Sequence, residues 1–409
     1  MQKILQDEKK RNMLFFLVIW GIITIGLFMR TFDWTANSYN SSILAISYKY
    51  GFTSRGLLGT IYQFLGSLVG VDIWNYFVVF KFYVICTAVC YIVFAVMMLL
   101  FLKKTNVDNK KMEQYLILIF TMFFITMFAT EKNFGRIDMF MLLATIIAVY
   151  LIAIERFVWL VVPLTAIGVI FHQGYVFMFY NAVLVLLLYR ILSKEGKERG
   201  KYITVLVLSL VICAILFFWF QIVYRGGAHE YYDEAMRHAA TMGVEGKPHE
   251  ELLRAELLGV DLHDEELKYR LSNVIEIIIF IIFFSPYIIF VGKALIGTIK
   301  RQTETLSKLK YLAVILGPLT LLPNYIFKVD FGRWTFAGVS YFLLVFIFMY
   351  AINDRNIIES VDEGLLRLKN KVYRPFIFIM PFLFIPFMDV AVTVFTDRLC
   401  VLFRNIIGI

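Results

Sequence analysis

The chain has 409 residues, of which 60% are hydrophobic and 17% are charged, and its mean hydropathy is +0.75. This composition excludes a water-soluble globular domain and predicts a protein that resides in a lipid bilayer. The formal net charge of +9 does not indicate a nucleic-acid partner, because excess Lys and Arg in a multispanning protein mostly mark its cytoplasmic loops. The four cysteines lie in apolar surroundings without a nearby metal-binding set, so we interpret them as packing residues.

Apolar runs long enough to cross a hydrocarbon core of about 30 Å recur along the whole chain. The first run follows Lys9, Lys10 and Arg11 and lacks a small-residue cleavage site, which indicates a retained span and not a signal peptide. We expect membrane spans at residues 13–30, 75–101, 114–129, 138–154, 157–171, 175–190, 202–223, 273–292, 311–326, 335–352 and 375–396.

The distribution of basic residues predicts the orientation of these spans. With the N-terminus inside, the cytoplasmic segments are 1–12, 102–113, 155–156, 190–201, 293–310 and 353–374. They hold 24 of the 40 Lys and Arg residues, as the positive-inside rule requires. Trp34, Trp74, Trp219 and Trp334 then gather near the outer interface, where an aromatic belt is expected.

Two stretches leave alternatives open. Residues 157–190 form either two short spans that meet at His172 or one long kinked helix, and the basic residues on both sides favour two spans. The tail from 397 to 409 is either an external amphipathic helix or a weak last span, and Asp397 and Arg398 argue against burial in lipid.

The predicted fold is therefore all-α, a polytopic protein of the cell membrane with about eleven transmembrane helices and a cytoplasmic N-terminus. Residues 1–223 form an N-terminal transmembrane module whose first external loop, 31–74, carries the expected site. Residues 224–272 form an external hydrophilic helical loop between the seventh and eighth spans, and residues 273–409 form a second transmembrane module.

The polar clusters of the chain all fall on the external side of these spans, which suggests one binding or reaction centre there. In the first loop, apolar residues at helical spacing predict an amphipathic interfacial helix, namely Leu57, Leu58, Ile61, Phe64, Leu65 and Leu68. Thr53 or Ser54 is expected to cap this helix. Arg55 beside its first N–H groups would bind phosphate, and an interfacial helix with an ordinary basic flank is equally consistent.

Acidic residues and one histidine supply candidate catalytic groups. Asp33 directly follows the first span and is either a solvated loop charge or a catalytic base. Glu131, Arg136 and Asp138 crowd the short loop after the third span, where they either face water or line a polar cavity, since unpaired charges in hydrocarbon are costly. His172, between the fifth and sixth spans, is either a hydrogen-bonded structural residue or a proton-transfer group.

The later loops repeat this pattern. Lys328, Asp330 and Arg333 follow the ninth span, and Pro318 and Pro323 predict a kink in the helix that leads to them. The insertion 225–270 holds eleven Asp or Glu and four of the five histidines, with helices expected near 229–242 and 249–258. It lacks a HExxH spacing, so we interpret it as a solvated helical lid. We name no cofactor and leave a divalent metal open.

The sequence contains no Walker loop, no Rossmann glycine fingerprint and no convincing GxSxG elbow. The cytoplasmic loops are too short to build a nucleotide-binding domain. An enzyme of this shape that works outside the cytoplasm would have no nucleotide supply, so its activated substrate should arrive on a lipid.

The arrangement resembles the GT-C glycosyltransferases, which use polyprenyl-phosphate-linked sugars at the extracytoplasmic face. The resemblance rests on Asp33 after the first span, the amphipathic helix in a long first loop, Glu131 and Asp138 after the third span, and the hydrophilic insertion after the seventh. Size and span number are also similar to the Wzy-type polymerases of capsule and O-antigen synthesis.

This resemblance implies a glycosyltransferase that moves a sugar or oligosaccharide from a polyprenyl-(pyro)phosphate to a glycan acceptor. Arg55, Arg136, Lys328 and Arg333 would stabilise the leaving phosphate with Asp330 beside them, Asp33 would be the base, Glu131 or Asp138 would bind sugar hydroxyls or orient a basic side chain, and His172 would be the reserve proton carrier. The alternatives are a transporter or flippase of polyprenyl-linked saccharide and an acyltransferase with His172 as base.

Overall fold

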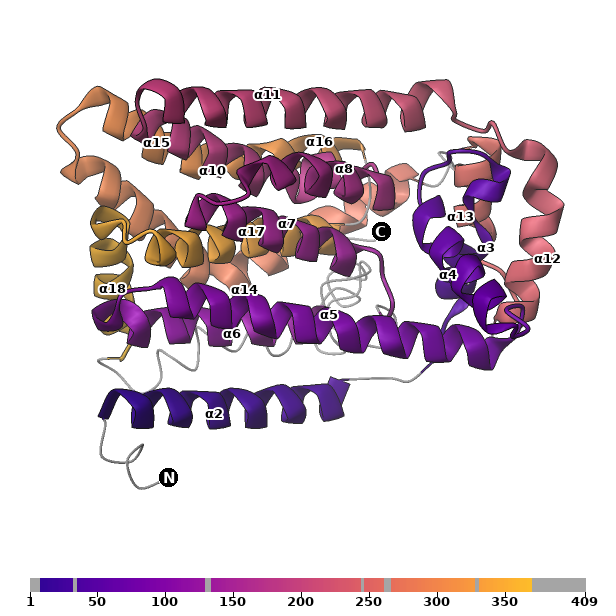
Figure 1. The fold of residues 1–409 in the computed structure, drawn as a ribbon, viewed down its shortest axis with the longest axis horizontal. Helices are drawn as coiled ribbons and strands as arrows, with labels where there is room; N and C mark the ends of the chain where they lie inside the picture. Colours follow the sequence, from indigo (N-terminus) through magenta and orange to yellow (C-terminus); the bar gives the residue numbers. More distant parts are fainter. Residues whose placement is uncertain are drawn as a thin grey trace.

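The computed structural model describes residues 8–31, 35–128, 134–243, 246–260, 266–327 and 331–369, and these contain helices and no strand (Figure 1). The all-α prediction is therefore confirmed for the described part of the chain. Hydrocarbon offers no hydrogen-bond partner to a peptide group, so each apolar segment satisfies its own backbone by forming a helix.

Within the described ranges, six helical segments are long and apolar enough to cross a membrane: Lys10–Met29, Tyr76–Lys104, Val107–Phe128, Gly196–Val223, Thr305–Tyr325 and Gly332–Ala351. They correspond to α2 (Glu8–Thr31), α5 (Tyr76–Lys104), η2 (Val107–Asn109) with α6 (Lys110–Phe128), α11 (Gly196–Phe218) with η4 (Trp219–Val223), α15 (Thr305–Leu316) with its continuation, and α17 (Phe331–Ala351). The membrane-protein prediction is supported at this coarser level.

Shorter apolar helices fill the other predicted spans. They are α7 (Asp138–Ile154), η3 (Val158–Leu160) with α8 (Val161–Phe171), and α10 (Tyr180–Ser193), and the long helix α14 (Glu266–Arg301) covers the predicted span at 273–292. The chain breaks after Phe171 and restarts as the short α9 (Tyr175–Met178), as the two-helix alternative for 157–190 predicts. The last predicted span, 375–396, and the tail lie outside the described residues.

The predicted proline kink is present. Pro318 opens a 3-10 segment, η7 (Gly317–Leu321), which interrupts the path from α15 to α16 (Leu322–Phe327). A proline inside an α-helix removes one hydrogen bond and clashes with the preceding turn, so the α-helical geometry stops there.

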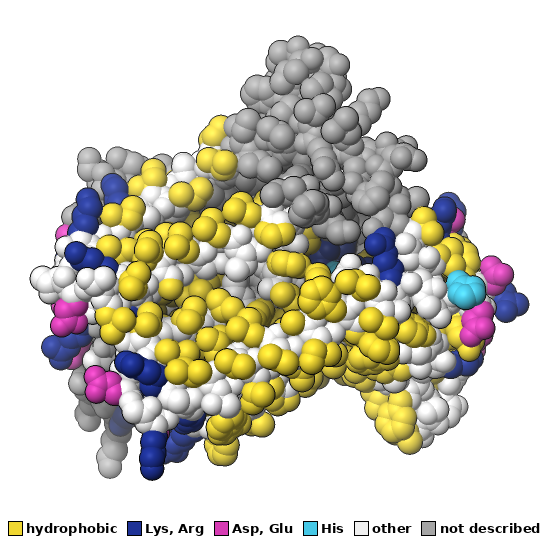
Figure 2. All heavy atoms as spheres, turned by 90° about the horizontal axis from the view of Figure 1, so that it is seen from above, with side chains coloured by type: hydrophobic (Ala, Val, Ile, Leu, Met, Phe, Trp, Pro, Cys, Tyr) yellow, Lys and Arg dark blue, Asp and Glu magenta, His cyan; other side chains and the backbone are white. Residues whose placement is uncertain are grey.

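The helices pack through large aromatic side chains at the centre of the bundle. Phe94 stacks on Phe124 with ring centroids 4.2 Å apart, and Phe123 stacks on Phe336 at 4.7 Å. All four rings are buried, and α6 and α17 are the most enclosed of the long helices. The face seen in Figure 2 is covered by hydrophobic side chains in its middle, with charged side chains gathered at the two ends.

One end of the bundle carries a body that we call the cap, made of residues 35–74 and 224–260. The first part contains α3 (Ser38–Ala45), η1 (Tyr48–Tyr50) and α4 (Gly56–Val69), and the second contains η5 (His229–Tyr231), α12 (Tyr232–Met242), α13 (Glu250–Leu253) and η6 (Arg254–Leu258). Figure 1 shows these helices together at the right-hand end.

The two parts of the cap share one hydrophobic core. Ala235, Ala239, Leu253 and Leu257 of the second part are fully buried together with Ile43 and other residues of the first. Charged residues of the insertion such as Glu230, Glu250 and Glu251 are exposed, but its apolar side chains are packed in this core, so the insertion is a packed part of the cap and not only the solvated lid that its composition predicts. The expected helices near 229–242 and 249–258 are present.

The predicted amphipathic helix is α4. Phe64, Leu65 and Leu68 expose apolar side chains on its outer face, while Leu58 and Tyr62 are buried against the cap. An exposed apolar stripe beside membrane-spanning helices is what an interfacial helix presents to lipid.

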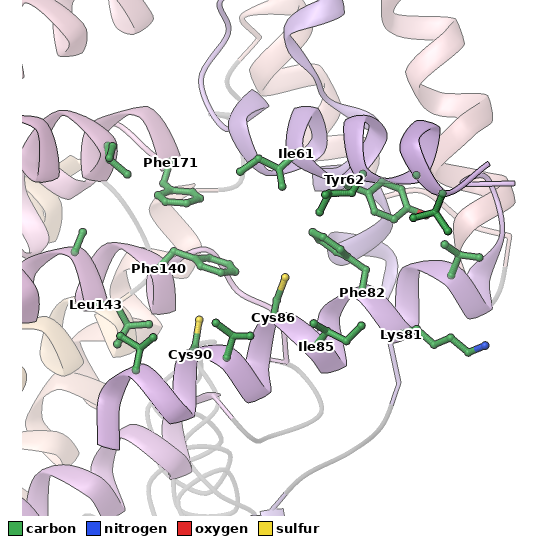
Figure 3. A pocket seen from close by; sticks show the side chains of 18 of the residues that line it. Ile61, Tyr62, Lys81, Phe82, Ile85, Cys86, Cys90, Phe140, Leu143 and Phe171 are labelled. Carbon is green, nitrogen blue, oxygen red and sulfur yellow. The ribbon is translucent and has the colours of Figure 1, made fainter. Parts of the chain in front are cut away.

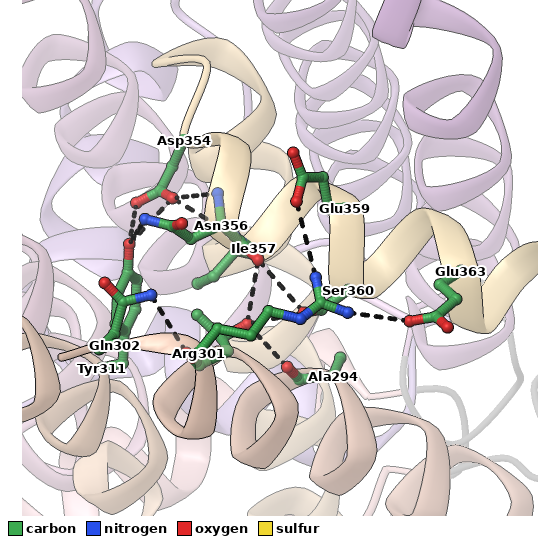
Figure 4. A network of polar contacts seen from close by, with 11 residues as sticks. Ala294, Arg301, Gln302, Tyr311, Asp354, Asn356, Ile357, Glu359, Ser360 and Glu363 are labelled. Carbon is green, nitrogen blue, oxygen red and sulfur yellow. Dashed lines mark hydrogen bonds and ion pairs between the residues drawn. The ribbon is translucent and has the colours of Figure 1, made fainter.

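The opposite end of the bundle is held by a buried polar network around Asp354, in the turn between α17 and α18 (Arg355–Lys369) (Figure 4). The carboxylate accepts hydrogen bonds from the hydroxyls of Tyr189 and Tyr311 and from the backbone N–H groups of Asn356 and Ile357. Asp354 therefore caps α18 and ties it to α10 and α15.

Replacing Asp354 with alanine should destabilise the protein by about 2–4 kcal/mol, because α18 loses its cap and two buried hydroxyls lose their acceptor. Thermal unfolding of the full-length protein in detergent measures the effect. The control is Glu359→Gln, which removes only an exposed ion pair to Arg301 at 3.6 Å and should change stability by about 1 kcal/mol or less. Equal melting temperatures for the two variants would contradict the role given to Asp354.

Candidate functional site

Five of the nine predicted site residues lie within the described part of the chain, and all five are at the cap end. They are Arg55, Arg136, Asp138, His172 and Arg333. The other four predicted residues, Asp33, Glu131, Lys328 and Asp330, lie outside the described residues, so their proposed roles stay predictions.

Arg55 joins three segments of the chain. Its Nη2 lies 3.0 Å from Nε2 of His172, in the turn between α8 and α9, and its Nε lies 3.2 Å from Oε1 of Glu256, in the second part of the cap. The side chains of Arg55 and Glu256 are only 15% and 8% exposed, so the ion pair is largely shielded from water. Largely buried pairs of this kind are costly to break by removing one partner.

The N-cap residue predicted for helix α4, Thr53 or Ser54, is wrong. Arg55 itself precedes α4 in a left-handed conformation with φ 60°, and neither Thr53 nor Ser54 caps the helix. The hydroxyl of Ser54 instead donates a hydrogen bond to Oε1 of Gln173. The left-handed turn at a residue other than glycine costs energy, and it directs the chain so that Arg55 and Ser54 both reach the turn at residues 172–174.

The orientation of His172 follows from its partners. A guanidinium only donates hydrogen bonds, so Nε2 of His172 accepts from Arg55. Nδ1 of His172 lies 2.9 Å from Oε1 of Gln173 and 3.4 Å from the backbone N of Gly174. His172 is held in one orientation by these contacts, as the hydrogen-bonded interpretation of this residue predicts.

Arg136 lies against α3. Its guanidinium carbon lies 4.4 Å from the centre of the Tyr39 ring, and the edge of that ring faces His249 at 6.1 Å between centroids. The short loop that carries Arg136 is fixed to the cap, because the side-chain amide of Asn40 donates to the carbonyl of Phe134 at 2.7 Å. A side chain at Gly135, with φ +74°, would also collide with Asn40.

Asp138 and Arg333 form a buried pair between the first turns of α7 and α17. Both Nη2 and Nε of Arg333 donate to Oδ1 of Asp138, at 2.8 and 3.1 Å. Oδ2 of Asp138 is buried without a protein partner in the described part of the chain. Of the two roles predicted for Asp138, this geometry supports orientation of a basic side chain, and the positive end of the α7 dipole further stabilises the carboxylate.

The pKa of His249 depends on the charged groups of the site. Nδ1 of His249 accepts a hydrogen bond from the backbone N–H of Leu252 and so caps the N-terminus of α13. The backbone N–H of His249 donates to the hydroxyl of Ser42 at 2.8 Å. Burial lowers the pKa of His249 below its ordinary value, and the positive charges of Arg136 and Arg55 lower it further, against the opposing effect of Glu251. Both guanidinium groups therefore lower the pKa of the same imidazole.

Sequence reasoning missed Glu256, Tyr39 and His249 as members of this site. Glu256 contacts Arg55, Tyr39 contacts Arg136 and His249 contacts Tyr39, each across a long stretch of chain, and no local spacing signals such a contact. Within the described residues, no group of three His, Cys, Asp or Glu is placed to hold a metal ion.

No protein-family model matches this sequence, and no curated protein or solved structure shows significant similarity to it. The chemistry of the site is therefore argued from its own residues. Three guanidinium groups and two carboxylates lie at the cap end of the bundle, and guanidinium groups are the side chains best suited to bind an anion.

Lowering the pH from about 7.5 to about 5.5 should loosen α13. The pKa of His249 in the folded protein is below its value in the unfolded chain, so the form in which α13 is unfolded binds more protons. The stability contributed by neutral His249 is therefore lost as the pH falls through the unfolded pKa of about 6.5. Protonation also removes the acceptor that caps Leu252.

Hydrogen–deuterium exchange of residues 250–258, corrected for the intrinsic effect of pH, measures this loosening. His249→Gln should remove the pH dependence, whereas His229→Gln, at an exposed position of the same cap, should retain it. Exchange in the unmodified protein that does not change with pH would show that His249 is not the controlling group.

Proposed function

We propose that this protein is an integral membrane glycosyltransferase. It transfers a sugar or oligosaccharide from a polyprenyl-(pyro)phosphate donor to a glycan acceptor during synthesis of a surface polysaccharide such as capsule, exopolysaccharide or O-antigen, and polymerisation of repeat units is one form of this activity. The observation that carries the proposal is the presence of the Arg55–His172–Glu256 cluster at the same end of an apolar bundle as Arg136 and the Asp138–Arg333 pair.

The charges suit the departure of a lipid phosphate. Glycosyl transfer leaves negative charge on the phosphate oxygens, and guanidinium groups fixed in a partly buried site stabilise that charge without reorganisation. Arg55 is the best placed for this role, because its carboxylate partner Glu256 already occupies the position of an anion. A phosphate that replaced Glu256 would find the same donors.

Proton removal from the acceptor hydroxyl requires a base. Asp33 is our preferred candidate on sequence grounds. His172 accepts a hydrogen bond from Arg55 at the nitrogen that would take the proton, so it can act as a base only when Arg55 has turned to another partner. In the arrangement described, His172 positions Arg55.

The interior of the bundle argues against a transporter of the same lipid. A transporter needs polar groups or broken helices near the middle of the membrane, whereas the described centre is filled by stacked, buried rings such as Phe94, Phe123 and Phe336. The polar groups of the proposed site gather at the cap end. By the positive-inside rule we place the cap outside the cell membrane, with about eleven spans and a cytoplasmic N-terminus.

Arg55→Ala should lower the rate of glycosyl transfer at least about 100-fold, because one fixed donor to the developing charge is lost. The measurement is surface polysaccharide in cells that contain the variant at normal membrane levels. Arg254→Ala is the matched control, since Arg254 lies in the same cap and its side chain forms a surface ion pair with Glu250 at 3.7 Å. Normal polysaccharide with Arg55→Ala would refute the site.

A deletion strain separates transferase from transporter. Loss of a transferase should leave lipid-linked saccharide on the outer leaflet, where a membrane-impermeant reagent can modify it. Accumulation on the inner leaflet, protected from that reagent, would support the transporter and contradict the proposed function.

A further inference from the structure

An apolar groove of about 680 Å³ lies between α4, α5, α7 and α8 (Figure 3). Its lining is aliphatic and aromatic, with Cys86 and Cys90 among the side chains, and Lys81 is the one charged residue among the described residues that line it. Figure 3 shows Phe171 and Phe140 on one side of the space and Ile61 and Tyr62 of α4 above it. The volume is in the range of ordinary ligand sites.

The groove opens sideways at the level of the membrane helices. Ile85 and Val89 of α5 line it and are 62% and 51% exposed, and Leu65 of α4 and Ile167 of α8 are also exposed lining residues. The one tyrosine hydroxyl nearby, that of Tyr62, donates to the carbonyl of Ile73. An apolar recess that faces hydrocarbon holds a lipid chain and not water.

The groove ends beside the polar site. Phe171 immediately precedes His172, and Phe140 follows Asp138 by two residues. Their rings stack in parallel with centroids 5.1 Å apart and line the groove at that end. Helix α4, which forms the roof of the groove, begins directly after Arg55. The lining residue Ile61 is therefore about 9 Å from Arg55 along the helix axis.

The roof is a fixed part of the fold. A side chain at Gly59 of α4 would lie 1.9 Å from the carbonyl of Ile46, and one at Gly66 would collide with Ile73. Only glycine at these two positions permits α4 to lie this close to Ile46 and Ile73. The groove therefore exists without any closing movement.

We infer that this groove binds the isoprenoid chain of the lipid-phosphate donor and presents its phosphate to Arg55. The inference rests on the proposed function. A single recess that ends at an anion site fits one chain with one phosphate head, whereas a two-chain phospholipid would leave a chain outside. The stem of Lys81 lines the groove and its ammonium group points away from it (Figure 3), so Lys81 adds positive charge near the mouth.

The test uses the full-length protein in nanodiscs and a polyprenyl monophosphate that carries a photoactivatable group near the far end of its chain. Labelling should map to residues 85–93 of α5 and 143–147 of α7. Ala144→Trp, which fills the groove, should reduce labelling at least about tenfold. Ile85→Trp, at an exposed lining position that tolerates a large side chain, should do the same, whereas Val207→Trp on the exposed face of α11 should not.

Two results would overturn the inference that the groove binds the isoprenoid chain. One is labelling that the two groove variants leave unchanged, and the other is equal labelling by a phospholipid with the photoactivatable group on an acyl chain, which would mean that bulk lipid fills the space. Because the probe carries no sugar, the readout is independent of transfer. Failed labelling with normal polysaccharide synthesis refutes the groove alone, and groove labelling in a protein that transfers no sugar refutes the proposed function alone.

Discussion

The Arg55 guanidinium is the interaction on which the arrangement of the cap end depends. It links the start of α4, the turn at His172 and Glu256 of the insertion, which come from three separate parts of the chain. Hydrocarbon excludes unpaired charge, so polar side chains collect at the ends of the bundle and must find partners there. The Asp138–Arg333 pair does the same for α7 and α17. Together these contacts bring basic groups to one place without exposing them to lipid.

Hydropathy predicts the helices of this protein well, because a membrane allows almost no other backbone structure. The break at His172, the 3-10 segment at Pro318 and the amphipathic α4 follow from local chemistry that a sequence displays. The partners of the polar residues do not. Nothing near Arg55 indicates Glu256, and nothing near Asp138 indicates Arg333, because each contact is made by folding and not by spacing. The cap residue of α4 was mispredicted for a related reason: Ser54 has a competing partner, Gln173, that is remote in sequence.

The apolar groove and the polar site at the cap end are built from the same segments of the chain. The same turn supplies Phe171 to the groove and His172 to the polar cluster, and α4 supplies both the roof of the groove and, at its start, Arg55. A lipid that carries a phosphate on one long chain matches this continuity of apolar and basic surface. The insertion then closes the site from above through Glu256, and its shared core with the first loop fixes that position.

The most direct measurement is a structure of the full-length protein in a nanodisc with bound polyprenyl monophosphate. We expect phosphate density within hydrogen-bonding distance of Arg55, with Glu256 displaced from it and the chain leading into the groove between α5 and α7. Phosphate bound at the opposite end of the bundle, or a cap whose Arg55–Glu256 pair is unchanged while the lipid is bound elsewhere, would contradict the account.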